Sequence, residues 1–208
     1  MSVSVKICGI NDDAGMKAAV DSGADFVGFV FYPPSRNAVS PRRARELAQL
    51  VPPQIKQTGL FVDATDDELL AVTSRVPLNL VQLHGKETPQ RVAEVRALTG
   101  LPVMMAIRLM SAEHLKMIPP YEAVADRLLF DSRMGAEASG GPIDWSLLKG
   151  RTFTKPWMLA GGLNAQNLVE AVRVSGATAI DVSSGVEDRP GHKSPDKIRE
   201  LLMVAGRL

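Results

Sequence analysis

The sequence alternates eight times between a short apolar or β-branched run and a helical stretch. The runs are VSVKIC (3–8), DFVGFVF (25–31), KQTGLFV (56–62), LNLVQLH (78–84), PVMMAI (102–107), RLLFD (127–131), PWMLAG (156–161) and TAIDVS (178–183). The clear helical patterns cover 12–22, 41–51, 66–76, 89–99, 164–175 and 194–205. Because strands that alternate with helices pair in parallel through right-handed crossovers, the pattern predicts an α/β protein with a parallel sheet.

Eight is the number of βα units that closes a (β/α)₈ TIM barrel. Units of about 26 residues would make this barrel compact, and we expect residues 1–208 to form one domain. The fifth and sixth helices are weak, with short candidates at 111–118 and 144–149. A doubly wound open sheet is the alternative, because local patterns do not show whether a sheet closes.

Helix boundaries are marked by capping residues. Ser40 and Thr88 each precede a proline, which is typical of a cap followed by the first helical residue. Gly23, Gly100 and Gly176 are expected to end helices, since glycine tolerates the left-handed conformation.

Composition limits the partners of this chain. A net charge of +1 and the absence of Lys/Arg runs predict no binding to nucleic acid or to an anionic membrane. No segment approaches the ~20 apolar residues of a membrane span. The single cysteine permits no internal disulfide, which is typical of the reducing cytoplasm. The three histidines lie far apart in sequence, so we expect no metal.

Reactive side chains lie at the ends of several strands. If Val5 and Ile7 face the helices, alternation points Lys6 and Cys8 into the barrel. The same parity points three more groups inward near strand ends, namely His84, Asp131 and Asp181. Taken singly, each has a structural explanation, such as a loop cap or a satisfied core histidine. Their convergence at the end of the barrel where such enzymes place their sites favours an active site.

Two glycine loops predict a phosphate site. LAGGLN (159–164) places Gly161 and Gly162 between the seventh strand and a helix, which Asn164 can cap. DVSSGVE (181–187) follows the eighth strand with a second set, Ser183, Ser184 and Gly185, and can open a short helix. Backbone N–H groups approach an anion closely at glycine, and these two loops are the usual phosphate site of a TIM barrel. Two tight turns without a ligand are the alternative.

The motifs together resemble those of a known family over essentially the whole chain. They are, in order, KICGI, ADFVGFVFYPPS, GLFVD, VQLHG, LLFDS, IDW, LAGGLN and DVSSGVE followed by PGHK. This combination resembles phosphoribosylanthranilate isomerase of tryptophan biosynthesis.

The resemblance implies an Amadori rearrangement of N-(5'-phosphoribosyl)anthranilate to 1-(2-carboxyphenylamino)-1-deoxyribulose 5-phosphate, with no cofactor. It implies that Cys8 is the general base and that Asp131 is the general acid. A thiol is mostly neutral at pH 7, so a nearby positive charge would help to activate Cys8. Lys6 is the candidate for that charge, although a structural role for Lys6 is the favoured interpretation.

The resemblance also implies the substrate contacts. The two glycine loops would hold the phosphate, Asp181 would contact the sugar, and His84 would line the site. The family has a Ser-x-Arg pattern after the second strand, whereas this chain has SRNAVS with Asn37 in the arginine's place. We expect Arg36 to bind the anthranilate carboxylate, with Asn37 as the alternative. EASGGPIDW (137–145) also departs from the family in the sixth loop.

Two other functions remain open at this point. The related sugar isomerase of histidine biosynthesis would require an aspartate in place of Cys8 and a second phosphate site, and the loop VDATDD after the third strand is acidic. A phosphosugar-binding barrel without catalysis is the other alternative, since the arginine is displaced. We expect a small phosphoribosyl ligand and a monomer, with a homodimer as the alternative.

Overall fold

The computed structural model describes residues 3–131 and 144–208, and its centre is a closed parallel barrel. The strands of the barrel are β1 (Ser4–Cys8), β2 (Phe26–Val30), β3 (Lys56–Phe61), β4 (Leu80–Leu83), β5 (Val103–Arg108), β6 (Arg127–Asp131), β7 (Trp157–Leu159) and β8 (Ala179–Val182). All eight expected strands are therefore present, each within two residues of the expected start.

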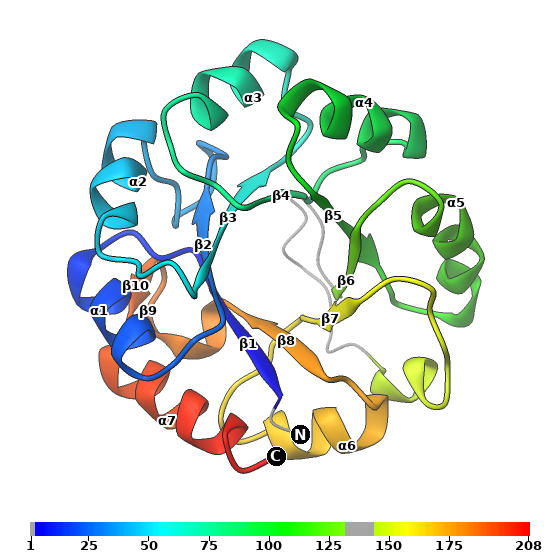
Figure 1. Cartoon of the computed structure of the whole chain (residues 1–208). Helices are drawn as coiled ribbons and strands as arrows, with labels where there is room; N and C mark the ends of the chain where they lie inside the picture. The colour runs from blue at the N-terminus through cyan, green and yellow to red at the C-terminus, as the bar shows by residue number, and fades with distance from the viewer. Residues whose placement is uncertain (1–2, 132–143) are drawn as a thin grey trace.

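The helices surround the barrel on its outside (Figure 1). Those of the described residues are α1 (Asp13–Asp21), α2 (Pro41–Ala48), α3 (Asp66–Thr73), α4 (Pro89–Thr99), α5 (Ile118–Glu122), α6 (Leu168–Ser175) and α7 (Pro195–Ala205). Short 3₁₀ turns are η1 (Ala112–Met117), η2 (Trp145–Leu148) and η3 (Ser184–Val186). The short α5 and the single turn η2 confirm that the fifth and sixth helical positions are weak.

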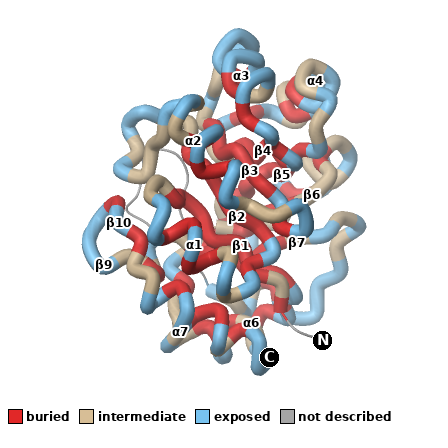
Figure 2. The backbone as a smooth tube through the Cα atoms, turned by 60° about the vertical axis from the view of Figure 1, so that its left-hand side comes forward, coloured by how far each residue is buried: buried red, intermediate tan, exposed pale blue. Residues whose placement is uncertain are grey.

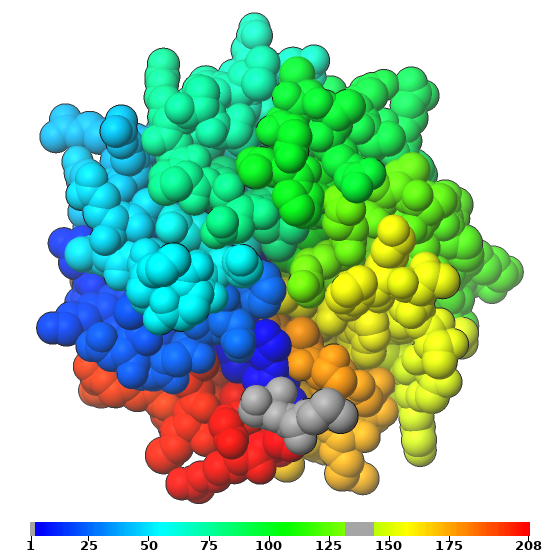
Figure 3. All heavy atoms as spheres, viewed as in Figure 1, coloured from blue at the N-terminus to red at the C-terminus, as the bar shows by residue number. Residues whose placement is uncertain are grey.

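The sheet closes where its first and last strands meet. β1 pairs in parallel with β2 on one side and with β8 on the other, and Lys6 lies opposite Asp181 in the β1–β8 register. The open doubly wound alternative is therefore wrong for this chain. Figure 3 shows that atoms fill the middle of the ring that Figure 1 draws as open ribbon, as expected for a packed barrel core.

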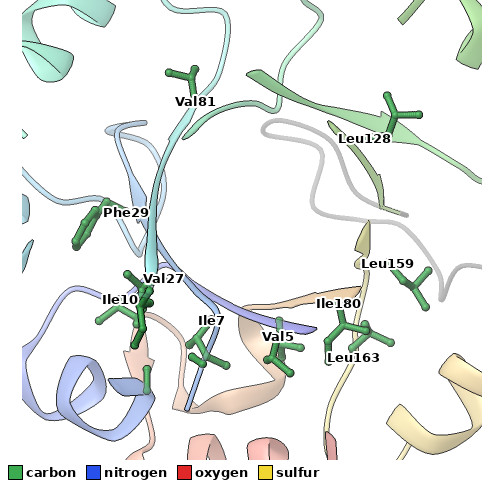
Figure 4. Close-up of a cluster of buried hydrophobic side chains, with 14 of the residues drawn as sticks. Val5, Ile7, Ile10, Val27, Phe29, Val81, Leu128, Leu159, Leu163 and Ile180 are labelled. Carbon is green, nitrogen blue, oxygen red and sulfur yellow. The ribbon is translucent and has the colours of Figure 1, made fainter. Parts of the chain in front are cut away.

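Two hydrophobic layers hold the barrel together. The outward residues of the strands, such as Val5, Ile7 and Ile180, pack under the helices (Figure 4). The inward layer consists of Phe26, Leu80, Met104, Ala106, Leu129, Met158, Ala160 and Ala179. Because strands of a parallel barrel are covered on both faces, their backbone is buried almost throughout, as the colouring of Figure 2 shows.

The helix signals in the sequence have the predicted geometry. The side chains of Ser40 and Thr88 accept hydrogen bonds from the backbone N–H groups of Arg43 and Arg91. Gly100 and Gly176 end α4 and α6 in the left-handed conformation, with φ of 66° and 75°.

Two features differ from the expected pattern. The helix expected over 164–175 begins only at Leu168, because Asn164 instead closes a turn by accepting from the N–H groups of Gln166 and Asn167. A small antiparallel hairpin, β9 (Glu187–Arg189) with β10 (His192–Lys193), follows η3 and was not predicted. Residues 137–143 of the sixth loop, where the sequence departs from the family pattern, lie outside the described residues.

Candidate active site

Cys8 ends β1 inside the mouth of the barrel. Its side chain is 4% exposed and packs with Val30 and Leu60, which are inward residues of the two strands that follow. The neighbouring outward residue, Ile7, belongs to the layer under the helices. The predicted alternation along β1 is therefore confirmed, and the only thiol of the chain faces the barrel interior.

Lys6 lies one inward position below Cys8 and is completely enclosed. Its Nζ donates to Oδ1 of Asp181 on β8 at 2.9 Å, and both side chains are buried. The β1–β8 register brings this pair together. The structure therefore places Cys8 and Asp181 around one buried cation.

Lys6 opposes the effect of burial on the pKa of Cys8, and the negative charges oppose it on the pKa of Lys6. Burial raises the pKa of the Cys8 thiol, while the nearby Lys6 ammonium lowers it and Asp181 raises it further, with a net rise. For Lys6, burial alone would lower the pKa, but the negative charges of Asp181 and Cys8 outweigh burial and raise it. Lys6 therefore carries a positive charge at neutral pH.

His84 and Asp131 meet at the ends of β4 and β6. Nε2 of His84 lies 3.6 Å from Oδ2 of Asp131, and both side chains are mostly buried. Nδ1 of His84 lies 2.9 Å from the amide nitrogen of Gln82. Because an amide nitrogen only donates, Nδ1 accepts, and the neutral ring then carries its proton on Nε2, towards Asp131.

The two glycine loops are pressed against each other. A β-carbon at Gly185 would collide with the backbone carbonyl oxygen of Leu163, so only glycine fits at this contact. Gly161 and Gly162 have φ of 90° and 74°, a region that L-residues with side chains rarely adopt. The loops after β7 and β8 therefore form one continuous backbone surface.

Lys193 of β10 holds the loop after β8 in place. Its ammonium group, which is fully buried, donates to the carbonyl and hydroxyl oxygens of Ser183 at 3.1 Å each and to Oε1 of Glu187 at 2.7 Å. Partial burial would raise the pKa of Glu187, but the hydrogen bond and charge of Lys193 outweigh it and lower that pKa. Ser183 is therefore held by a cation that the pattern of strands and helices does not predict.

The two candidates for carboxylate binding, Arg36 and Asn37, have different surroundings in the loop after β2. Arg36 is exposed, and its backbone packs against Gly191 of the hairpin. Asn37 instead lies against Gly9, the residue after Cys8, and donates to Oε1 of Glu187 at 3.0 Å. Asn37 thus connects the end of β1 with the loop after β8, while Arg36 remains at the surface.

The predicted residues fall into three groups. Cys8 and Asp181 share Lys6, His84 faces Asp131, and the two glycine loops touch through Gly185 and Leu163. Arg36 lies apart from these groups. Three residues that contact these groups were not predicted as site residues. Gln82 points into the barrel by the same alternation as His84, and Lys193 and Glu187 belong to the PGHK and SGVE motifs.

Two further structural findings concern the described residues only. Among residues 3–131 and 144–208, no group of three or more His, Cys, Asp or Glu side chains could hold a metal ion. No helix within these ranges has the length and apolar character needed to cross a bilayer.

A closed parallel barrel of eight strands, with a thiol, a carboxyl group and two glycine loops at the carboxyl ends of its strands, is the architecture of the (β/α)₈ barrel enzymes. The family model for N-(5'phosphoribosyl)anthranilate (PRA) isomerase matches residues 5–204. The chain belongs to this family.

Individual relatives agree with the family model. The N-(5'-phosphoribosyl)anthranilate isomerase of Paramagnetospirillum magneticum is 52% identical over 99% of this chain and 98% of that protein. The solved phosphoribosyl anthranilate isomerase from Thermotoga maritima has a TM-score of 0.90 and 36% identity, over 99% of this chain and 100% of the other. A solved phosphoribosyl anthranilate isomerase in complex with reduced 1-(o-carboxyphenylamino)-1-deoxyribulose 5-phosphate has a TM-score of 0.86, with 35% identity over 99% of this chain and 100% of the other.

Proposed function

We propose that Cys8 and Asp131 are the base and the acid of the isomerisation that defines this family. The activity is the Amadori rearrangement of N-(5'-phosphoribosyl)anthranilate to 1-(2-carboxyphenylamino)-1-deoxyribulose 5-phosphate, a step of tryptophan biosynthesis. The observation that carries the assignment is the inward position of both groups at the carboxyl ends of β1 and β6. Barrel enzymes build their sites at this end.

Asp131 acts first, as the acid. The protonated carboxyl group donates to the ring oxygen of the ribose, the bond between that oxygen and C1' breaks, and a protonated Schiff base forms at C1'. His84 supports this step because its Nε2 faces Asp131 and its ring is held by Gln82. The carboxylate left behind is then next to a hydrogen-bond donor.

Cys8 acts second, as the base. The iminium group makes the neighbouring C2' proton acidic, and the thiolate takes this proton to give an enolamine. The enolamine gains a proton at C1' and loses the proton of the 2'-hydroxyl group, which gives the ketone. Substrate and product are isomers, so no electron acceptor and no cofactor take part.

The remaining predicted residues bind the substrate. The joined backbone of Gly161, Gly162 and Gly185, together with Ser183 and Ser184, suits a phosphate group. Because the Ser183 hydroxyl oxygen accepts from Lys193, its own proton is available for donation to a phosphate oxygen.

Two residues orient the rest of the substrate. Asp181 is proposed to contact the sugar from β8. Arg36 is proposed to reach the anthranilate carboxylate from the exposed loop after β2, because Asn37 is already engaged with Glu187.

Both rival functions are less well supported. An isomerase of the histidine pathway would need an aspartate where this chain has Cys8, and the family match over 5–204 argues against that pathway. A binding barrel without catalysis would not need a thiol held beside a buried cation.

We propose a single domain over 1–208, a monomer, and the cytoplasm as the compartment. A cysteine that works as a base must stay reduced, which the cytoplasm ensures. Sedimentation equilibrium of the purified chain tests this prediction, since a homodimer would have twice the molecular mass of the monomer.

The activity is tested by generating phosphoribosylanthranilate in place from anthranilate and phosphoribosyl pyrophosphate and following its fluorescence. Consumption by the wild-type chain and not by Cys8→Ala would support both the reaction and the base. If neither chain consumes the compound, the binding-barrel alternative takes over.

A further inference from the structure

We infer that Lys6 is a positioning residue for the reaction: its ammonium group supplies the positive charge that favours the thiolate form of the Cys8 sulfur against the effect of burial, and Asp181 sets how much of that charge reaches the sulfur. This inference rests on the proposed role of Cys8 as the base. It assigns a role in the chemistry to a lysine whose favoured interpretation from the sequence was structural.

The placement of Lys6 is costly without such a role. Its side chain is completely buried, and moving an ammonium group out of water carries a large free-energy penalty that its attraction to a counterion must offset. Asp181 takes one of its three N–H groups, at 2.9 Å. Apolar pairs of similar volume would pack a barrel interior at least as well, so the retained charge points to function.

Gly28 of β2 lies beside both the cation and the sulfur. A β-carbon built on Gly28 of β2 would lie 3.0 Å from Sγ of Cys8 and 3.1 Å from Nζ of Lys6. Both atoms therefore border the same small space, beside a strand position that lies next to Cys8 in the β1–β2 register. Glycine leaves this space open, and a β-carbon at this position would be in tight contact with both groups.

The other charges around the sulfur are already compensated. From the loop after β8, Lys193 faces the same end of the barrel, but its three N–H groups are taken by Ser183 and Glu187. From β2 and β3 the neighbours of Cys8 are the apolar Val30 and Leu60. Lys6 and Asp181 are the charged groups that act most strongly on the thiol, ahead of Lys193.

The expected effects of the two partners on the thiol have opposite signs. Burial raises the pKa of Cys8, Lys6 lowers it, and Asp181 raises it. Removal of Lys6 should therefore make the thiolate rarer, whereas removal of Asp181 should make it more abundant. A lysine that only supports the scaffold would give no such opposite pair of shifts.

The test is a titration of the thiol itself. The ultraviolet absorbance of the thiolate is followed against pH for the wild type, Lys6→Met and Asp181→Asn, each with a matched chain that also carries Cys8→Ala as the blank. Because Cys8 is the only cysteine, the difference signal reports one group. We expect Lys6→Met to raise the midpoint by about one pH unit or more, a tenfold loss of thiolate at a given pH, and Asp181→Asn to lower it.

A loss of the fold must be distinguished from a shift of the thiol midpoint. Lys6→Met leaves the Asp181 carboxylate buried without its cation, so the double variant Lys6→Met/Asp181→Asn is compared with Asp181→Asn alone. In the double variant Lys6 is removed without leaving the Asp181 carboxylate buried and uncompensated. Circular dichroism checks that each variant has the fold of the wild type.

An unchanged midpoint after removal of Lys6 in both backgrounds would overturn the inference, as would a rise of the midpoint in Asp181→Asn. The acidic limb of kcat/KM should move in the same direction as the thiol midpoint. The proposed function fails separately: it fails if Cys8→Ala turns over normally, whatever the titration shows.

Discussion

Nζ of Lys193 lies 2.7 Å from Oε1 of Glu187 across the hairpin β9–β10, and the same ammonium group donates to Ser183 in the loop after β8. Glu187 also accepts from Asn37 and from the N–H of Gly191. One carboxylate thus joins the loop after β2, the hairpin and the proposed phosphate loop. Its loss should be felt both in stability and in substrate binding.

We expect Glu187→Gln to destabilise the fold by roughly 1–3 kcal/mol at neutral pH, because the hydrogen bonds involve charged groups. The pKa of Glu187 is lowered below its ordinary 4.5 despite partial burial, chiefly by Lys193. Its contribution is therefore complete above pH 4.5 and is lost as the pH falls through the folded-state pKa. Urea unfolding of both chains at pH 7 and below pH 4.5 measures the difference, which should shrink in acid.

Glu113→Gln is the matched control. The Lys116–Glu113 pair has the same 2.7 Å separation but both side chains are largely exposed. It should change stability by less than about 1 kcal/mol, since solvent screens exposed pairs. Equal effects of the two substitutions, or a pH-independent effect of Glu187→Gln, would mean that the buried pair contributes nothing special.

Cys8→Ala should lower kcat by about 10²–10⁴-fold, because proton transfer by a positioned group accounts for a factor of this size. The side chain is small and buried among Val30 and Leu60, so alanine should keep the fold. The affinity for the reduced product analogue, measured by calorimetry, should change little. Near-normal turnover would remove Cys8 from the mechanism.

Asp131→Asn should reduce kcat by a similar factor, since an amide cannot protonate the ring oxygen. Asp188→Asn is the control: this aspartate is exposed on the hairpin and should be neutral. Single-turnover kinetics with both variants separate binding from chemistry. A wild-type rate in Asp131→Asn would require a different acid.

Gly185→Ala should weaken phosphate binding strongly and destabilise the fold by about 1–3 kcal/mol, because the new methyl group meets the carbonyl oxygen of Leu163. Gly162→Ala is the companion variant. It has open space around the new methyl group and suffers only the strain of φ 74°, about 1–2 kcal/mol. Inhibition by inorganic phosphate compares the two, and equal inhibition constants would argue against a shared backbone site.

Arg36→Ala should raise KM several-fold with little change in kcat, because the proposed contact is made to a part of the substrate that does not react. Asn37→Ala should also disturb the Glu187 contact and thus act on stability as well. An unchanged KM in Arg36→Ala would identify Arg36 as a solvated surface residue.

The strands were predictable because each is a short, dense apolar run, and the alternation of side chains along a strand gave the parity of the residues in β1. The same parity correctly turned Cys8 inward and Ile7 outward. It could not reveal the Lys6–Asp181 pair, because that contact depends on the β1–β8 register and on closure of the sheet. Closure is a property of the whole ring and leaves no mark in any one segment.

The hairpin escaped prediction for a different reason. β9 and β10 have three and two residues, too few for any period to be seen. The role of Lys193 depends on this hairpin, which sets its buried side chain against Ser183. The direction in which the Arg36 side chain points was also not predictable from the sequence, because an exposed side chain has no packing to fix it.

Ring closure has a consequence for how the protein is made. Lys6 and Asp181 are 175 residues apart, yet their strands are direct neighbours in the finished barrel. During synthesis the chain emerges at about 5–20 residues per second, so Lys6 waits on the order of ten seconds or longer for its partner. A chain released before β8 would carry an unmatched ammonium group where the barrel interior should form, which would destabilise the incomplete product.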